Sequence, residues 1–211
     1  FPQSDAVSGE RIADRERRKY ACARCVLVCG GWVDLPGGED GLTRKPEYET
    51  VAAFGPLLLI DDLDLIVQAN DYCDRAGIDT IGIGAAIALA MECYENGLIT
   101  QEDTGGLDLA WGNKAVLMPL LRQAVQREGF GGLLADGPYH AAQRIGGDAG
   151  AFAMEIGREA IPMHDPRLRP GWATSYQIDA TPAHHEQGGA HFGEGAWGIP
   201  GFHTPEFDRY T

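Results

Sequence analysis

Three cysteines crowded into eight consecutive positions constrain this sequence more than any other feature. Cys22, Cys25 and Cys29 follow a C-x2-C-x3-C spacing, and the whole chain has only five cysteines. Thiolates at this spacing can bind one face of a metal centre, and a closed site then needs a fourth ligand. Three sulfurs with one distant ligand favour a 4Fe–4S cluster over zinc, because zinc sites more often pair two C-x2-C segments or add nearby histidines, and the first histidine here is His140. The alternatives are a disulfide with one spare thiol, three unconnected thiols, or a structural zinc site.

The composition limits the classes of function. The chain has 211 residues, of which 44% are hydrophobic, and this is enough to bury the core of one large domain or two small ones. Its formal net charge is −14, from 31 acidic and 17 basic residues, so binding to nucleic acid or to an acidic membrane is not expected. No run of about 18 apolar residues occurs, so we expect no transmembrane helix. The odd number of clustered cysteines argues against a secreted disulfide framework, and we expect a cytoplasmic protein.

Helical periodicity dominates the chain up to about residue 150, so we expect a mainly α fold. Asp61 or Asp62 would cap a helix that Gly77 ends, and further helices are expected at 83–96, at 114–128 before Gly129, and from about Pro138 to 146. An extended segment with a turn is expected at 32–38. Beyond residue 150, Pro, Gly, His and Trp become frequent, and 186–203 reads as an ordered loop. We therefore place a boundary between a domain at 1–153 and a second, loop-rich domain at 154–211.

A charged stretch at 9–20 lies directly before the cysteines, and its residues favour a helix. With Arg24 it forms the only strongly basic patch of the sequence, made of Arg11, Arg15, Arg17, Arg18, Lys19 and Arg24. Such a run is either a solvated helix face or a docking surface for an acidic electron carrier.

Several stretches together resemble the tungsten-containing aldehyde:ferredoxin oxidoreductase family, in the order in which that family has them and over nearly all of the chain. They are Cys22-Ala-Arg-Cys-Val-Leu-Val-Cys29-Gly, Pro46-Glu-Tyr-Glu-Thr50, Asn70-Asp-Tyr-Cys-Asp-Arg-Ala-Gly-Ile-Asp-Thr80, Leu134-Ala-Asp-Gly137, His164-Asp-Pro-Arg167, and Trp172-Ala-Thr-Ser175 with the histidine pair that follows it. The resemblance implies helical domain 2 and part of helical domain 3 of such a subunit. In the family these follow an N-terminal, β-rich domain that cradles a bis-pterin cofactor, and a fourth cluster cysteine lies further toward the C-terminus. We therefore expect this chain to be the middle portion of a longer subunit, inactive by itself.

The resemblance also implies roles for the cofactor-binding residues. Cys22, Cys25 and Cys29 would be three of the four ligands of a 4Fe–4S cluster. The segment from Asp74 through Gly77 and Ile78 to Asp79 matches the family's first D-x-x-G-L-C/D pterin motif, with Ile in place of Leu. A glycine at a helix end lets the backbone approach a planar ring, and the two aspartates can accept hydrogen bonds from pterin N–H groups. Taken alone, the segment reads as a helix C-cap with acidic neighbours.

Two further residues would act on the substrate. Glu49 matches the glutamate that the family places beside the metal, with Glu47 as the near alternative. A carboxyl there could take or give a proton as water or hydroxide adds to an aldehyde carbonyl. His184 matches the histidine that hydrogen-bonds the substrate oxygen, with His185 as its near alternative.

The implied activity is oxidation of an aldehyde to a carboxylic acid at a tungsten or molybdenum bis-pterin, with electrons leaving through the 4Fe–4S cluster to a ferredoxin-like carrier. Two alternatives stay open: a related tungsten subunit that reduces an aromatic acyl thioester, and a non-catalytic iron–sulfur electron-transfer or scaffold protein. The expected partners are that carrier, a small aldehyde and the remaining parts of the same subunit. A homo-oligomer is also expected, although Gln68 stands where the family's metal site between subunits has a glutamate.

Overall fold

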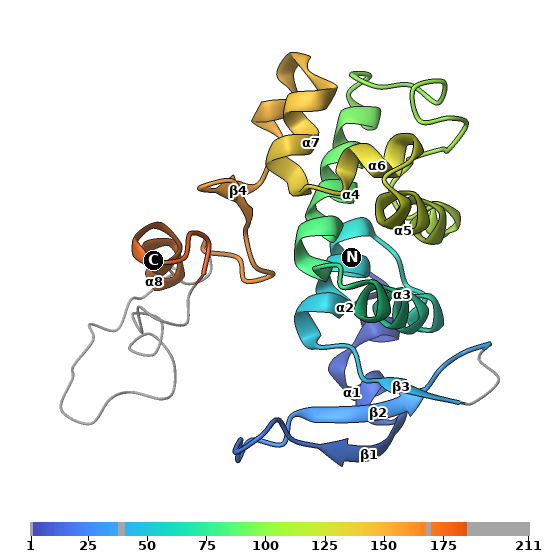
Figure 1. The fold of residues 1–211 in the computed structure, drawn as a ribbon, viewed down its shortest axis with the longest axis vertical. Coiled ribbons are helices and arrows are strands. Elements are labelled where there is room, and N and C mark those ends of the chain that lie inside the picture. Colours follow the sequence, from blue (N-terminus) through green and yellow to red (C-terminus); the bar gives the residue numbers. More distant parts are fainter. Residues whose placement is uncertain (1, 38–40, 168–169, 185–211) are drawn as a thin grey trace.

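The computed structural model describes residues 2–37, 41–167 and 170–184, and helices dominate them, so the expected mainly α fold is confirmed (Figure 1). The helices are α1 (Gly9–Ala13), α2 (Tyr48–Phe54), α3 (Leu63–Ala76), α4 (Thr80–Glu95), α5 (Leu117–Gln126), α6 (Gly129–Leu134), α7 (Gly137–Ile145) and α8 (Pro170–Ile178). The strands are β1 (Glu16–Tyr20), β2 (Gly30–Asp34), β3 (Leu42–Arg44), β4 (Glu155–Ile156) and β5 (Glu159–Ala160). Short 3-10 turns lie at Ser4–Val7, Pro56–Leu58, Lys114–Val116 and Gly147–Ala151.

A small antiparallel sheet carries the cysteines. β2 is its central strand and pairs with β1 on one side and β3 on the other. The expectation that 9–20 is helical is wrong beyond Ala13, because the second half of the stretch forms β1. Cross-strand contacts favour the strand: the Tyr20 and Trp32 rings lie 5.7 Å apart, and the Arg17 side chain pairs with Asp34. Cys22, Cys25 and Cys29 therefore lie in the loop that joins β1 to β2.

The helices α3 and α4 form the centre of the structure, and α4 runs through the middle of Figure 1. Asp62 caps α3 and Gly77 ends it with a φ of 70°, as the sequence predicts. α4 begins three residues earlier than expected because the Asp79 carboxylate caps it, accepting hydrogen bonds from the backbone N–H groups of Ile81 (3.3 Å) and Gly82 (2.6 Å). Gly77, Ile78 and Asp79 of the predicted pterin motif therefore form the turn between two core helices, while Asp74 lies in the last turn of α3.

Close packing of α2 on α4 brings the starts of both helices together. A Cβ atom on Gly84 would lie 2.8 Å from the Cβ of Ala53, so α4 approaches α2 at a distance that only glycine permits. Nearer the helix starts, the hydroxyl oxygens of Thr50 and Thr80 lie 2.7 Å apart. As a result Glu49, in the first turn of α2, lies on the same side of the core as the Asp79 cap of α4.

The helix expected at 114–128 is shorter than the sequence suggests. A 3-10 turn covers Lys114–Val116, and α5 ends at Gln126 because Arg127 takes a left-handed backbone conformation with a φ of 54°. Gly129, expected to stop this helix, instead begins α6. The Gln123 side chain accepts a hydrogen bond of 2.8 Å from the Gly131 N–H and so joins the two helices. α7 begins with Pro138 in its first turn, as predicted.

Beyond residue 150 the structure becomes irregular. β4 and β5 form a two-stranded hairpin, α8 follows, and both lie to one side of the helical body in Figure 1. The domain boundary between 153 and 154 stays a prediction, and the whole Gly-rich stretch at 186–203, together with His185, lies outside the described residues. Within the described part of the chain no single helix is long and apolar enough to cross a membrane, and only α3 and α4 taken together, bent by 120°, pass that test of length and composition.

Replacing Asp62 with alanine should lower the free energy of unfolding by about 1–2 kcal/mol. Its carboxylate accepts hydrogen bonds from the Leu65 N–H (3.1 Å) and from the Lys114 ammonium (2.9 Å), and the bond to Lys114 lowers the pKa of Asp62. A lowered pKa in the folded state gives stability at neutral pH that is lost as the pH falls through that pKa. Denaturant unfolding should therefore show a large difference at neutral pH that shrinks in acid, whereas Asp61→Ala at the neighbouring exposed position should have little effect.

Candidate functional site

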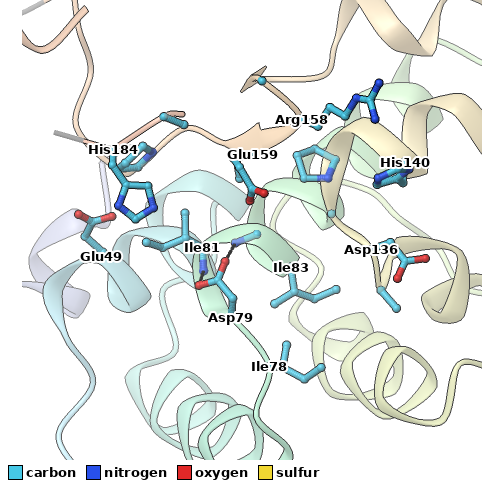
Figure 2. Close-up of a pocket in the computed structure, with 18 of the residues that line it drawn as sticks. Glu49, Ile78, Asp79, Ile81, Ile83, Asp136, His140, Arg158, Glu159 and His184 are labelled. Atoms are coloured by element: carbon cyan, nitrogen blue, oxygen red, sulfur yellow. Dashed lines mark hydrogen bonds between the residues drawn. The ribbon is translucent and has the colours of Figure 1, made fainter. Parts of the chain in front are cut away.

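One cavity of about 840 Å³ gathers charged side chains from distant parts of the sequence (Figure 2). Its walls come from the first turn of α2, the turn between α3 and α4, the start of α7, the β4–β5 hairpin and the segment after α8. The polar side chains that line it are those of Glu49, Asp79, Arg127, Asp136, His140, Arg158, Glu159 and His184. A cavity of this size with convergent ionisable groups is the best candidate for a binding or active site.

The cavity unites most of the residues that the sequence singles out. Glu49, Gly77, Ile78, Asp79 and His184 all line it. Two other candidates lie elsewhere: Asp74 lines a smaller cavity of about 250 Å³ beside β3, and Glu47 lines a third cavity next to Cys29. The structure thus distinguishes Glu49 from Glu47 by position and separates Asp74 from the rest of its motif.

Both carboxyl oxygens of Glu49 are hydrogen-bonded. Oε2 accepts the backbone N–H of Met163 at 3.1 Å, and Oε1 lies 3.1 Å from Nε2 of His164. The Tyr48 hydroxyl lies 3.4 Å from the same Oε1 and 2.9 Å from the same Nε2. His164 is a contact that sequence reasoning missed as a site residue, although its His-Asp-Pro-Arg stretch is part of the family resemblance.

The turn between α3 and α4 presents backbone and one carboxylate to the cavity. A Cβ atom added to Gly77 would meet nothing within 4 Å, so this stretch of backbone is open to a planar group. Asp79 uses both carboxyl oxygens to cap α4, and each oxygen keeps capacity for another donor. The open glycine and the remaining acceptor capacity of Asp79 fit the edge of a pterin.

His184 reaches the cavity through packing of the segment that follows α8. The Ala183 N–H donates to the carbonyl of buried Tyr176 at 3.2 Å, and the His184 N–H donates to the Thr181 carbonyl at 3.2 Å. A Cβ atom on Gly157 would lie 2.6 Å from Pro182, so the β4–β5 hairpin approaches this segment closely. His184 and Glu49 appear at one side of Figure 2, and His140 and Asp136 at the other.

Sequence reasoning also missed the opposite side of the cavity. The Asp136 carboxylate pairs with Arg144 and, at 2.8 Å, with Arg127, and these two guanidinium groups lower its pKa. The Arg158 guanidinium lies 5.2 Å from the centre of the Tyr139 ring, within the range of a cation–π contact. Arg127, Asp136 and Arg158 come from loops or from the residue before a helix, so no periodicity in the sequence marks them.

The five cysteines fall into two physical classes. Cys73 and Cys93 are fully buried in the core, and burial raises the pKa of their thiols to about 12 and about 11, so both stay protonated at neutral pH. Cys22 and Cys29 are exposed and Cys25 is half-buried, so all three can reach a metal. Among the described residues no group of three His, Cys, Asp or Glu side chains is arranged to hold a metal ion. The donor set of three accessible thiols on one loop fits a thiolate-bound cluster.

Most of the basic patch has partners in the fold. Arg15 pairs with Asp64, Arg17 pairs with Asp34, and the Lys19 ammonium lies 3.9 Å from the Glu16 carboxylate. The Arg18 guanidinium lies 5.7 Å from the centre of the Trp32 ring. The patch is therefore a mixed-charge surface around the sheet, and its role in docking a carrier stays a prediction.

Comparison with known proteins decides the family. The family model for aldehyde ferredoxin oxidoreductase, domains 2 and 3, matches residues 1–209. The chain belongs to the aldehyde ferredoxin oxidoreductase family. Five residues to which the family resemblance assigns a role thus line one cavity, namely Glu49, Gly77, Ile78, Asp79 and His184.

Relatives within the family show how much of a subunit this chain represents. It is 39% identical over 195 residues to a tungsten-containing aldehyde ferredoxin oxidoreductase of Pyrococcus abyssi. That alignment covers 90% of this chain and 30% of the relative. It is 33% identical over 168 residues to an aliphatic sulfonate oxidoreductase, WOR-like subunit, of Pyrococcus furiosus, covering 78% of this chain and 26% of the relative. The chain therefore spans less than a third of the length of these curated relatives.

The fold is also similar to that of a solved structure, the active site complex BamBC of benzoyl coenzyme A reductase in complex with 1,5-dienoyl-CoA. The superposition has a TM-score of 0.66 at 24% identity, and it covers 81% of this chain and 26% of the other. At this identity the likeness describes the fold alone.

Proposed function

We propose that this chain supplies one wall of the active site of a tungsten-dependent oxidoreductase that oxidises an aldehyde to a carboxylic acid. The observation that carries the proposal is that Glu49 and His184 line one cavity together with Gly77, Ile78 and Asp79. Family membership and the tungsten-containing relatives support it. The rest of the subunit, including another segment of the pterin site and a fourth cluster ligand, comes from beyond these residues.

Addition of water to an aldehyde followed by two-electron oxidation yields the carboxylic acid, two protons and two electrons. Glu49 takes a proton from water as its oxygen adds to the carbonyl carbon, a task that suits a carboxylate at the wall of a cavity. His184 donates a hydrogen bond to the carbonyl oxygen, where negative charge develops. The tungsten bis-pterin, or a molybdenum equivalent, accepts the two electrons when bound. Gly77, Ile78 and Asp79 would form the protein edge of one pterin, whereas Asp74 of the same motif lines a different cavity.

Cys22, Cys25 and Cys29 would hold a 4Fe–4S cluster, which would supply one-electron transfer to a ferredoxin-like carrier. Two apolar side chains beside these thiols, Val26 and Leu27, are 90% and 80% exposed, which supports a second protein segment that covers the loop. Remaining parts of the same subunit are the natural source of that cover, because these relatives are about three times as long as this chain.

A substrate assay on the whole protein, purified without oxygen, tests the proposed reaction. The rate of viologen dye reduction in the presence of aliphatic or aromatic aldehydes should exceed the rate with no substrate. Benzoyl-CoA with a reduced dye, and an aliphatic sulfonate, provide the competing arms, chosen from the two other chemistries found among the similar proteins. Turnover of the thioester or the sulfonate, with none of any aldehyde, would overturn the assignment.

A further inference from the structure

Two consecutive residues hold both oxygens of the Glu49 carboxyl group. The Met163 N–H donates to Oε2 and the His164 ring approaches Oε1, each at 3.1 Å. These residues lie more than 100 positions away in the sequence, in the segment between β5 and α8. The Tyr48 hydroxyl lies 2.9 Å from the same Nε2 and 3.4 Å from the same Oε1, so the imidazole, the phenol and the carboxyl group form one polar cluster. We call the Met163 N–H and the His164 imidazole the Glu49 clamp.

The clamp is itself held in place. The His164 ring lies 4.2 Å, centre to centre, from the ring of Trp172 in α8 and 5.3 Å from the ring of Tyr48 in α2. Its backbone carbonyl accepts a hydrogen bond of 3.0 Å from the hydroxyl of Tyr176, a fully buried residue whose pKa is raised by burial, so the phenol keeps its proton. The side chains of Glu49 and His164 are only 14% and 17% exposed.

The clamp also sits between two cavities. Glu49 lines the candidate active-site cavity, whereas His164 lines a second cavity of about 630 Å³ with mostly apolar walls, and Pro162 borders both. The His164 imidazole therefore approaches Glu49 from outside the site and does not line the cavity in which the substrate would bind.

We propose that His164 is a positioning residue for Glu49, which it holds in the orientation that faces the cavity. This rests on the proposed role of Glu49 as the group that takes the proton. The Met163 N–H holds Oε2, and the imidazole lies against Oε1 at a shorter distance than the Tyr48 hydroxyl, so loss of the imidazole would let the carboxyl group turn away from the cavity. A misplacement of about 1 Å in a reacting group can cost about 100-fold in rate.

Replacement of His164 in the whole enzyme tests the clamp. His164→Leu should lower kcat for aldehyde oxidation by about 100-fold with little change in KM, because it removes an interaction that matters in the transition state. His164→Gln keeps an N–H donor and should recover most of that loss. In a Glu49→Ala background, His164→Leu should change kcat by less than about twofold, since its effect passes through Glu49. An equal fall in kcat in the wild-type and Glu49→Ala backgrounds, or a rise in KM with no change in kcat, would overturn the proposal.

Thermal unfolding of the same four proteins gives a readout that needs no activity. The Tm of the Glu49→Ala, His164→Leu double variant should fall by less than the sum of the two single falls, because the contact that the two residues share is lost only once. Additive falls in Tm would overturn the pair even if the wild-type enzyme oxidises no aldehyde. A wild-type enzyme that oxidises no aldehyde would instead count against the proposed reaction. If His164→Leu does not fold, the same cycle is run with His164→Gln, for which additive effects are again the contradicting result.

Discussion

Glu49→Gln should lower kcat for aldehyde oxidation by about 10²- to 10⁴-fold, because the amide cannot take a proton from the attacking water. The substitution preserves size and leaves an amide oxygen that can still accept from the Met163 N–H or from His164, so tungsten content, iron content and Tm should change little. KM should stay within a few-fold of wild type, since the carboxylate acts mainly in the transition state. Steady-state kinetics together with metal analysis measure these quantities.

Glu47→Gln is the matched control for this change. Glu47 lies two residues away, is exposed, and lines a different cavity from Glu49. It occupies the N-cap position of α2 without a side-chain capping bond, so the amide should cost little stability. A loss at Glu47→Gln that matched the loss at Glu49→Gln would show that the two glutamates had been assigned wrongly, or that overall charge loss explains the effect.

Cys25→Ser should remove most of the iron from the protein and abolish electron delivery to a ferredoxin-like carrier. Changes to groups that merely orient a metal ligand cost about 10- to 100-fold in metal affinity, so loss of a direct ligand should cost more. Cys25 is the least exposed of the three loop cysteines, and its N–H donates to the Cys22 carbonyl at 3.0 Å, so the serine should keep the local turn. Iron analysis and the visible absorption of the cluster follow the loss.

Cys93→Ala provides the comparison within the same chain. Its side chain is buried in the core and its thiol stays protonated at neutral pH, so it should keep its full iron content despite some loss of stability. Full iron in Cys25→Ser would exclude Cys25 as a cluster ligand, and iron loss in Cys93→Ala would show that unfolding alone releases the cluster.

Local signals in the sequence predicted much of this fold because they act over a few residues. The Asp62 cap, the Gly77 end of α3 and the Pro138 start of α7 all depend on side chains within one helical turn. The helix prediction was wrong at 16–20 because strand pairing, with contacts to Trp32 and Asp34, outweighs the helix-favouring composition of this stretch. The early end of α5 was not predicted, because nothing in the sequence marks Arg127 for a left-handed backbone conformation.

The candidate site was predictable only in part, because its residues come together through packing. Family resemblance named Glu49, Asp79 and His184, and all three line the cavity in which Gly77 and Ile78 also lie. His164 escaped notice as a site residue because its contact with Glu49 spans 115 positions and depends on Trp172 and Tyr176 of α8. The charged side opposite, with Arg127 and Asp136, depends on how α5, α6 and α7 fold back on one another.

Metal and pterin analysis of the whole native protein, purified without oxygen, tests the central claim most directly. The proposed site requires tungsten, or molybdenum in its place, with pterin and about four irons per chain, as a bis-pterin centre with one 4Fe–4S cluster demands. Iron without tungsten, molybdenum or pterin would contradict the claim and leave an electron-transfer or scaffold protein. Zinc in place of iron would contradict it as well, and would assign the three-cysteine loop to a structural metal site.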